Sequence, residues 1–345
     1  MARRILVTGA DTFWGGRMIQ ALETDPDFEV ILGMGSHAPS VPFERAEFVR
    51  ADASYSIVNR IVKATQVDTI LHTFMVTNTA GLGPRALHEI NVIGTMNLLA
   101  AAGASGSPVR HVVVKSSTLV YGSSARDPNT FSETTRRAGP ATHSIERALI
   151  DAENLVRDFS EDNPGTLVTV LRFANVLGPN LTTTISRCLS RPLCPAIFGF
   201  DPLLQFVEED DVVRSLLHVT HGAIPGLYNV AGEGRLPWSE VATRCGTHRV
   251  PLSPYSPLKI HPLARLFDMP PELNDLLRYG RGVDTRRLLA TGFAYGSTSA
   301  GAVEGFGREL RLRRSTGRSA PAYTYEPDVD QFFRHSPAVT ARTER

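Results

Sequence analysis

The stretch LVTGADTFWGGR, residues 6–17, decides the fold that we expect for this chain. It begins in RILVTG (4–9), a short apolar run that ends in glycine and is typical of a buried strand. It continues into WGGRMIQALETD (14–25), whose apolar residues have helical spacing and which ends before a proline. A strand that turns directly into a helix is half of a β-α-β unit, so the stretch predicts an α/β protein.

Two glycines mark the turn between that strand and that helix. Gly9 and Gly15 stand at the ends of a G-x-x-x-x-x-G frame. Glycines at such a turn let the backbone approach a pyrophosphate, whose charge the helix N-terminus attracts. The middle glycine of a G-x-x-G-x-x-G pattern is replaced by Thr12, which adds bulk where phosphates would pass. The loop therefore predicts either a dinucleotide-binding turn or a tight turn without a ligand.

The alternation of strand and helix continues through the first half of the chain. Further runs typical of strands lie at 28–34, 46–52, 68–74, 109–118 and 166–173, and helical spacing recurs at 54–64, 83–106 and 141–162. Apolar, nearly unbroken strands between helices indicate a parallel sheet covered on both faces. We expect a Rossmann-type, doubly wound α/β fold, with a dinucleotide-binding domain over residues 1–175.

The pattern loosens beyond residue 176, where prolines become frequent. A helix is predicted at 207–222 and a strand at 226–232, but most of the remaining segments are short. We expect residues 176–311 to form a smaller, loop-rich, substrate-binding region interleaved with the sheet. Residues 312–345 are polar, basic and unpatterned, which predicts a mostly disordered tail.

Composition excludes several classes of function. The 36 basic and 35 acidic residues nearly cancel, so nothing global favours nucleic acid or an anionic membrane surface. The three cysteines show no Cys-x-x-Cys spacing, which argues against a disulfide framework and against a metal site. No window approaches the roughly 18 apolar residues that would span a bilayer. We expect a soluble, cytoplasmic protein with no nucleic-acid partner, no metal and no membrane span.

The end of the second strand bears on the choice of cofactor. A dinucleotide fold commonly places an acid there for the adenosine ribose, and the expected position holds Gly35 instead. Ser36 and His37 follow and leave room for a 2′-phosphate. NAD, NADP and a loss of tight binding therefore all stay open. Asp52, after the third strand, either holds the adenine amino group or caps the strand end.

Several motifs, in order along the chain, resemble one family. They are TGADTFWGG, NVIGTMNLL (91–99), KSSTLVYGSS (115–124), LRFANVLGP (171–179), FVEEDDVVRSLL (206–217), YNVAGEG (228–234) and VDTRRLLATGFAY (283–295). As an ordered set they resemble the extended short-chain dehydrogenases/reductases. The resemblance is to the NAD-dependent epimerase/dehydratase branch, which acts on nucleotide sugars and includes UDP-glucose 4-epimerase.

The resemblance implies a catalytic serine at Ser117, four residues before the tyrosine of the V-Y-G turn. It also implies a Tyr-x-x-x-Lys pair on the next helix, in which lysine binds the nicotinamide ribose and tyrosine relays a proton. The aligned residues here are His143 and Arg147, in the stretch HSIER. Their spacing places both on one helix face, so His143 could carry the proton and Arg147 could hold the ribose. The other reading is that this helix has lost its chemistry.

The resemblance further implies a cofactor-binding set and a substrate-binding set. The first comprises Gly9, Thr12, Phe13, Trp14, Gly15, Asp52, Ala53, Thr73, Phe74, Asn91 and Phe173. The second comprises Ser117, Tyr121 and Asn175. Asn91 matches a family position that steadies the loop near the active serine. Phe74 and Met75 replace small residues that the family keeps beside the cofactor, so that wall is expected to be crowded.

Two functions follow as expectations. The first is an NAD(P)-dependent epimerase, dehydratase or reductase that acts on a nucleotide sugar or a related polar metabolite. The second is a catalytically inactive, nucleotide-binding sensor or scaffold protein on the same fold, because a fold does not dictate a function. Family members often form homodimers through the helices expected at 83–106 and 141–162, and we expect the same here.

Overall fold

The computed structural model describes residues 3–77, 82–254, 267 and 269–316 of the chain. A seven-stranded sheet contains, in spatial order, β11 (Gly226–Val230), β6 (Leu167–Phe173), β5 (His111–Ser117), β4 (Thr69–His72), β1 (Arg3–Thr8), β2 (Phe28–Gly35) and β3 (Glu47–Arg50). All neighbouring strands in it are parallel. The chain runs outward from β1 on one side and then on the other, which confirms the predicted doubly wound, Rossmann-type fold.

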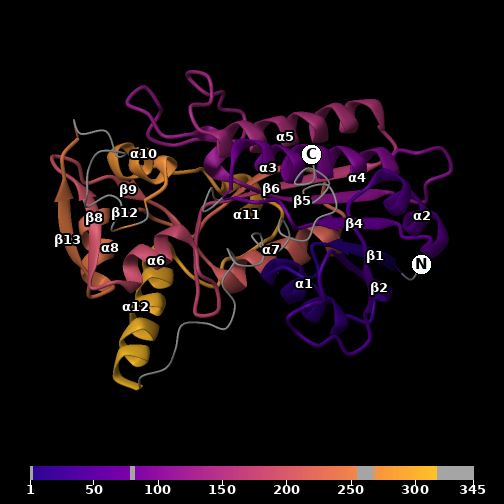
Figure 1. Ribbon diagram of the computed structural model, residues 1–345, viewed down its shortest axis with the longest axis horizontal. Coiled ribbons are helices and arrows are strands. Elements are labelled where there is room, and N and C mark those ends of the chain that lie inside the picture. The colour runs from indigo at the N-terminus through magenta and orange to yellow at the C-terminus, as the bar shows by residue number, and fades with distance from the viewer. Residues whose placement is uncertain (1–2, 78–81, 255–266, 268, 317–345) are drawn as a thin grey trace, which may run out of the picture.

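Helices cover both faces of this sheet (Figure 1). On one face lie α2 (Tyr55–Thr65), α4 (Gly94–Ala102) and α5 (Ser144–Asp162). On the other face lie α1 (Phe13–Glu23) and α7 (Glu209–Gly222). The sheet's buried side chains thus belong to two separate apolar cores, as the unbroken apolar strands predict.

The helix expected at 83–106 is interrupted, contrary to the prediction. It comprises α3 (Pro84–His88), a π-helical turn η1 (Glu89–Ile93) and α4. Asn91, fully buried in that turn, accepts a hydrogen bond from Val76 N and donates one to Val76 O, each at 2.8 Å. A π turn contains an extra residue and commonly marks a functional position. Here it turns the Asn91 amide onto the loop after β4, and a role in steadying the loop near the expected active serine stays a prediction.

The smaller region contains three two-stranded ladders and several helices. The ladders pair β7 (Asn175–Leu177) with β10 (Phe206–Glu208), β8 (Leu193–Ile197) with β13 (His248–Leu252), and β9 (Leu203–Leu204) with β12 (Leu236–Pro237). The helices are α6 (Thr184–Ser190), α8 (Trp238–Arg244), α10 (Pro271–Tyr279) and α12 (Ser299–Thr316), and α11 (Arg286–Leu289) packs against β11. A third apolar core surrounds the buried Trp238. Strand β11 belongs to the large sheet, and α7 packs on that sheet. The chain therefore passes between the two regions more than once.

Helix α12 extends into the segment that we expected to be disordered. It continues to Thr316, so residues 312–316 are helical rather than part of a tail that begins at 312. Its side chains Phe306 and Leu310 are buried, and Glu309 pairs with Arg313 one turn later at 2.8 Å, which supports the helix beyond its apolar part. Residues 317–345 of the expected tail lie outside the described residues. Among those described, no helix is long and apolar enough to cross a membrane.

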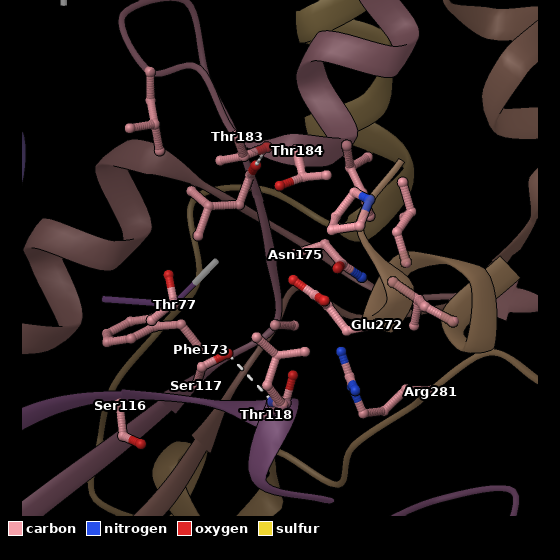
Figure 2. A pocket seen from close by; sticks show the side chains of 18 of the residues that line it. Thr77, Ser116, Ser117, Thr118, Phe173, Asn175, Thr183, Thr184, Glu272 and Arg281 are labelled. Atoms are coloured by element: carbon pink, nitrogen blue, oxygen red, sulfur yellow. Dashed lines mark hydrogen bonds between the residues drawn. The ribbon is translucent and has the colours of Figure 1, made fainter. Parts of the chain in front are cut away.

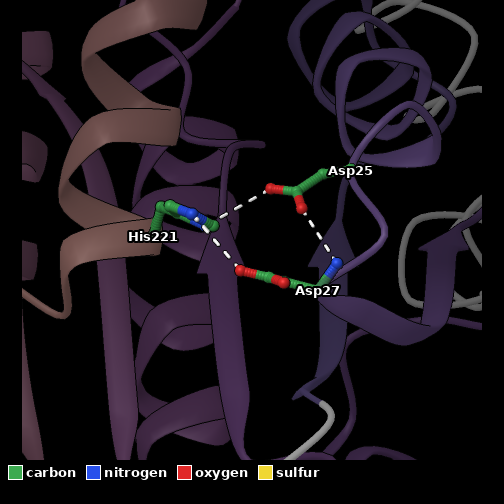
Figure 3. Close-up of side chains that lie close together, drawn as sticks. All are labelled: Asp25, Asp27 and His221. Atoms are coloured by element: carbon green, nitrogen blue, oxygen red, sulfur yellow. Dashed lines mark hydrogen bonds and ion pairs between the residues drawn. The ribbon is translucent and has the colours of Figure 1, made fainter.

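Two groups of titratable or charged side chains join separate elements around the sheet. His221, at the end of α7, faces Asp25 and Asp27 in the turn between α1 and β2, at 3.3 and 3.4 Å (Figure 3). A more buried pair joins β6 to α5, where Arg172 Nε lies 3.0 Å from both carboxylate oxygens of Glu153. Ser116 on β5 donates to the same carboxylate at 2.6 Å. Strands β5 and β6 are therefore held to α5 by one shared carboxylate.

Candidate active site

The first loop folds around its two glycines. A Cβ atom at Gly15 would lie 2.0 Å from Gly9 O, so no larger residue fits this turn. Gly9 has φ +73°, which favours glycine. Thr12 is the N-cap of α1: its hydroxyl donates to Gly9 O at 2.7 Å and accepts from Gly15 N at 3.2 Å. Its bulk is therefore folded back onto the loop, which explains how threonine replaces the expected middle glycine.

The space beside the end of β2, where an acid was expected on the strand, is occupied by Asp11 from the first loop. A Cβ atom at Gly35 would lie 2.3 Å from Asp11 Oδ1, so the carboxylate occupies the space beside the strand end. Oδ2 accepts hydrogen bonds from His37 N at 2.9 Å and Ser36 Oγ at 3.2 Å. No described residue donates to Oδ1, and the side chain is 13% exposed. Sequence reasoning missed Asp11 because it searched for the acid on the strand itself.

The end of β4 is packed rather than open. Thr73 donates to Thr8 O at 2.7 Å, and His72 bonds the Thr8 and Thr95 hydroxyls at 3.0 Å each. Burial, and then the charge of Lys115, lower the pKa of His72 to about 3, so its ring is neutral. The Phe74 ring lies against His72, with centroids 4.4 Å apart, and against Gly94 of α4. This wall is crowded, as its residue types predict.

A cavity lies beside the carboxyl ends of β5 and β6 (Figure 2). Four residues predicted for the site line it: Trp14, Ser117, Phe173 and Asn175. They come from α1, β5, β6 and β7, which are distant in sequence. The opposite side is formed by the start of α6, with Thr183 and Thr184, and by α10, with Glu272, Leu273 and Leu276. The structure thus brings together predicted residues of the cofactor-binding and the substrate-binding sets.

Polar groups in the cavity have defined partners. Ser117 Oγ accepts from Leu119 N at 3.2 Å, which leaves the hydroxyl proton available to another acceptor. Asn175 donates to Gln205 O at 3.0 Å. Arg281 is buried and donates to Gly122 O at 3.1 Å. Burial lowers the pKa of this guanidinium to about 10, so it stays charged at neutral pH.

Among the cavity residues that were not expected from the sequence, one is a lysine. Lys115, on β5, is only 3% exposed and lines the same wall as Ser117. Its ammonium lies over the Trp14 ring, 5.4 Å from the centroid. Burial lowers the pKa of Lys115 to about 8. A signal existed in the sequence, because a lysine interrupts an otherwise apolar strand at HVVVKSS (111–117).

The predicted pair His143 and Arg147 does not converge on the cavity. His143 precedes α5 as its N-cap, with extended backbone (ψ 147°), so it does not share a helix face with Arg147. Its Nε2 lies 2.8 Å from Asp275 Oδ2 on α10. Arg147 is exposed, and neither residue contributes to the cavity wall. His143 thus joins the start of α5 to the helix that covers the cavity.

Four further predicted residues lie outside the cavity wall. The Tyr121 hydroxyl donates to Asn229 Oδ1 at 2.8 Å, and its ring stacks on Phe131 at 4.7 Å. Asp52 is exposed and accepts from Ser54 N at 3.1 Å, which fits the strand-end role that we left open. Ala53 is half-buried beside it. Phe13 is buried in the core under the sheet, next to Trp14.

Comparison with known proteins assigns the family. The model of the NAD dependent epimerase/dehydratase family matches residues 5–231. The chain belongs to this family. An uncharacterized protein of Mycobacterium tuberculosis strain H37Rv, Rv0501, is 35% identical over 296 residues, which cover 82% of this chain and 77% of Rv0501. The UDP-glucose 4-epimerase of Erwinia amylovora is 28% identical over 186 residues, half of this chain and 53% of the epimerase.

Solved structures of similar fold agree with this assignment. MoeE5 in complex with UDP-glucose and NAD superposes with a TM-score of 0.68 at 20% identity, covering 91% of this chain and all of MoeE5. The UDP-glucuronic acid 4-epimerase of Bacillus cereus, in complex with NAD, superposes with a TM-score of 0.69 at 14% identity, over 93% of this chain and all of the epimerase. The resemblance drawn from the sequence motifs is thereby confirmed for family and fold.

The His143–Asp275 contact predicts a pH-dependent stability. The hydrogen bond to Asp275 raises the pKa of His143 above its ordinary value. A raised folded-state pKa stabilises the protein fully below the unfolded pKa of about 6.5, and this contribution disappears as the pH rises through the folded value. We therefore expect Asp275→Asn to lower the free energy of unfolding by about 1 kcal/mol at pH 5.5 and by less at pH 9. Urea denaturation at both pH values measures this.

The matched control is Asp158→Asn, which removes an exposed carboxylate from α5. It should leave both the pH dependence and the His143 titration, followed by NMR, unchanged. An Asp275→Asn variant whose His143 titrates as in the parent protein would contradict the contact.

Proposed function

We propose that this family member binds NAD and a nucleotide sugar, or a related polar metabolite, and catalyses epimerase, dehydratase or reductase chemistry in the cavity. The observation that carries the proposal is the meeting of Ser117, Phe173 and Asn175 with Trp14 in one cavity. In doubly wound sheets, ligands bind at the carboxyl ends of the strands, which is where this cavity lies. The NAD and UDP-sugar complexes named for the similar structures support the same ligand classes.

The residues fit a dinucleotide. The turn from Gly9 to Gly15 begins an eleven-residue helix, whose N-terminus attracts phosphate. The open Oδ1 of Asp11 can accept hydrogen bonds from ribose hydroxyls, and Phe173 and Trp14 offer apolar surface to a nicotinamide ring. A bound nicotinamide would supply hydride transfer. Ser117 would donate its hydroxyl proton to the reacting oxygen of the substrate, and Asn175 would contact the substrate beside it.

Asp11 favours NAD over NADP in this proposal. A carboxylate beside the adenosine ribose accepts hydroxyl groups and repels a 2′-phosphate. The opposing group is Arg50 at the end of β3, whose Nε donates to Ser36 O at 2.9 Å. Arg50 is exposed, whereas Asp11 is largely buried against Gly35. Because solvent screens an exposed charge more strongly, the carboxylate should dominate the choice.

Calorimetric titration with both cofactors tests this choice. We expect NAD⁺ to bind at least about tenfold more tightly than NADP⁺, a difference of about 1.4 kcal/mol. Asp11→Asn should remove most of that preference, whereas the control Asp158→Asn should keep it. Tighter binding of NADP⁺ to the parent protein would show that Arg50 decides the specificity and would refute the role of Asp11.

The proton relay of His143 stays a proposal with a structural condition attached. The cavity encloses about 120 Å³, less than the roughly 300 Å³ at the lower end of ligand pockets. A whole nucleotide sugar therefore requires the covering helices to shift. If α10 moves, Asp275 separates from His143, and the imidazole can then exchange a proton with a substrate. While α10 stays in place, the imidazole Nε2 is hydrogen-bonded to Asp275. Arg147 would have to turn inward from its exposed position to reach a ribose.

The pairing of His143 with Asp275 favours the second candidate function, a nucleotide-binding sensor without hydride chemistry. Incubation of the purified protein with NAD⁺ and UDP-sugars, followed by chromatography of the sugars and absorbance at the NADH band, separates the two. We expect turnover, and we expect Ser117→Ala to lower kcat/KM by about 100-fold or more while NAD⁺ affinity changes less than twofold. Thr118→Ser, a neighbouring conservative change, is the control. Binding without any conversion supports the sensor, and no binding refutes both.

We also propose that two copies pair through α4, the adjoining turn η1 and α5. Two large apolar side chains on this surface, Ile93 and Met96, are 36% and 42% exposed, which suits an interface. Light scattering after size exclusion should give twice the mass of the chain, and Met96→Glu should halve it. A monomeric parent protein would contradict the proposal.

A further inference from the structure

Lysine is scarce in this chain, and one of its lysines lies in the cavity. Of the 36 basic residues only three are lysines, at positions 63, 115 and 259. Arginine, used at all the other basic positions, cannot lose its proton in a protein, whereas lysine can. Lys63 is exposed on α2, and residue 259 lies outside the described residues. Lys115 is thus the described lysine whose protonation state can matter to a bound ligand.

Lys115 is costly to bury where it lies. The side chain is 97% buried, and no hydrogen bond or ion pair joins its ammonium to any described residue. The partner that the structure shows is the Trp14 ring, which attracts a cation only weakly compared with a carboxylate. Burial without a counter-charge disfavours the charged form of an amine, because the ammonium loses its hydration. Such groups cluster at sites where a ligand completes the environment.

Strand geometry directs Lys115 toward the same ligand as Ser117. Side chains two residues apart on a strand leave the same face, so Lys115 and Ser117 point together into the cavity. Ser116, between them, also borders the cavity, but its hydroxyl is directed to Glu153 of α5, to which it donates. All three are on β5, the strand that leads into the predicted catalytic serine. The cavity wall therefore presents a hydroxyl and an amine side by side.

The neighbouring ionisable groups do not raise the pKa of Lys115 back toward its ordinary value. His72, on β4, is neutral and therefore provides no negative charge that would stabilise the ammonium. Trp14 faces it from α1. The ionisable groups elsewhere in the cavity wall are Glu272 of α10 and Arg281, which carry opposite charges. The amine is therefore free to exchange its proton near neutral pH, which is the property that an acid–base group needs.

We propose that Lys115 is the proton-carrying residue of this family member, contacting the reacting hydroxyl of the substrate next to Ser117. This inference rests on the proposed function. In the oxidative direction the substrate O–H bond breaks and its proton goes to the neutral Nζ. The hydride leaves the same carbon with its electron pair for the nicotinamide dinucleotide of the proposed function, and a C=O bond forms. In reverse, the ammonium returns the proton to the oxygen.

The role explains why the residues aligned with Tyr-x-x-x-Lys lie outside the cavity wall. His143 bonds Asp275 and Arg147 is exposed, so neither holds the reacting oxygen in this structure. A basic group supplied from β5 instead of α5 leaves α5 without that task. It also accounts for a lysine, rather than the arginine that this chain uses almost everywhere else.

The experiment compares Lys115→Arg, Lys115→Met and the control Lys63→Arg. Arginine keeps the charge but cannot give up a proton, so Lys115→Arg should lose at least about 100-fold in kcat. Its affinities for NAD⁺ and for UDP-glucose should stay within about threefold of the parent protein. The kcat/KM of the parent protein for oxidation should rise with pH, with the midpoint of the rise near pH 8. The Lys63→Arg control should show the same pH profile. Full activity in Lys115→Arg overturns the proposal. So does a large loss of affinity in Lys115→Met that Lys115→Arg restores together with kcat, because the lysine then only anchors an anion.

A second readout does not depend on turnover. Protein grown with [¹³Cε]lysine contains three lysine signals, which the arginine variants assign, and their pH titration reports each amine. We expect Lys115 to titrate near 8 and to shift when UDP-glucose is added to the NAD⁺ complex, whereas the Lys63 signal should not respond to either ligand. A Lys115 that titrates near 10.5, or that ignores both ligands, overturns the inference. If the parent protein binds both ligands without converting any sugar, the proposed enzyme function fails by itself, and the proton role falls with it even when the Lys115 titration is as expected.

Discussion

The architecture depends on the contact between Gly9 and Gly15. With no side chain at either residue, the backbone of α1 starts directly against the carbonyl that ends β1. This close approach fixes where the first turn of the helix lies relative to the sheet edge. Thr12 caps the helix, Asp11 reaches the end of β2, and Trp14 reaches the cavity. Three positions of the candidate site are thus placed by one backbone contact.

Much of the fold could be predicted because apolar strands and amphipathic helices alternate without ambiguity. Gly9, Ser117, Phe173 and Asn175 could also be placed, since their motifs end strands of a parallel sheet and must meet at one edge. Asp11 could not, because an acid that reaches a strand end from another loop leaves no local pattern. His143 was misplaced by one helix boundary, where extended backbone, rather than residue spacing, sets the direction of the side chain.

Two buried basic side chains near the site, Arg172 and Lys115, differ in whether a negative charge lies beside them. Arg172 is buried but shares the Glu153 carboxylate, so its charge is compensated and serves the packing of β6 on α5. Lys115 is more deeply buried, and the described groups beside it are an aromatic ring and a neutral histidine rather than a carboxylate. The first arrangement stabilises a charge, whereas the second leaves it labile. Burial alone therefore does not distinguish a structural cation from a functional one; its counter-charge does.

The shared carboxylate of Glu153 also makes the two sides of the cavity mechanically unequal. On the sheet side, β5, β6 and α5 are joined to one another through the largely buried Glu153 carboxylate. On the other side, a partly exposed imidazole–carboxylate contact joins α10 to α5. Entry of a ligand should therefore displace the smaller region and leave the strands in place. The cavity residues on β5 then keep their positions when α10 moves, as the proposed reaction requires.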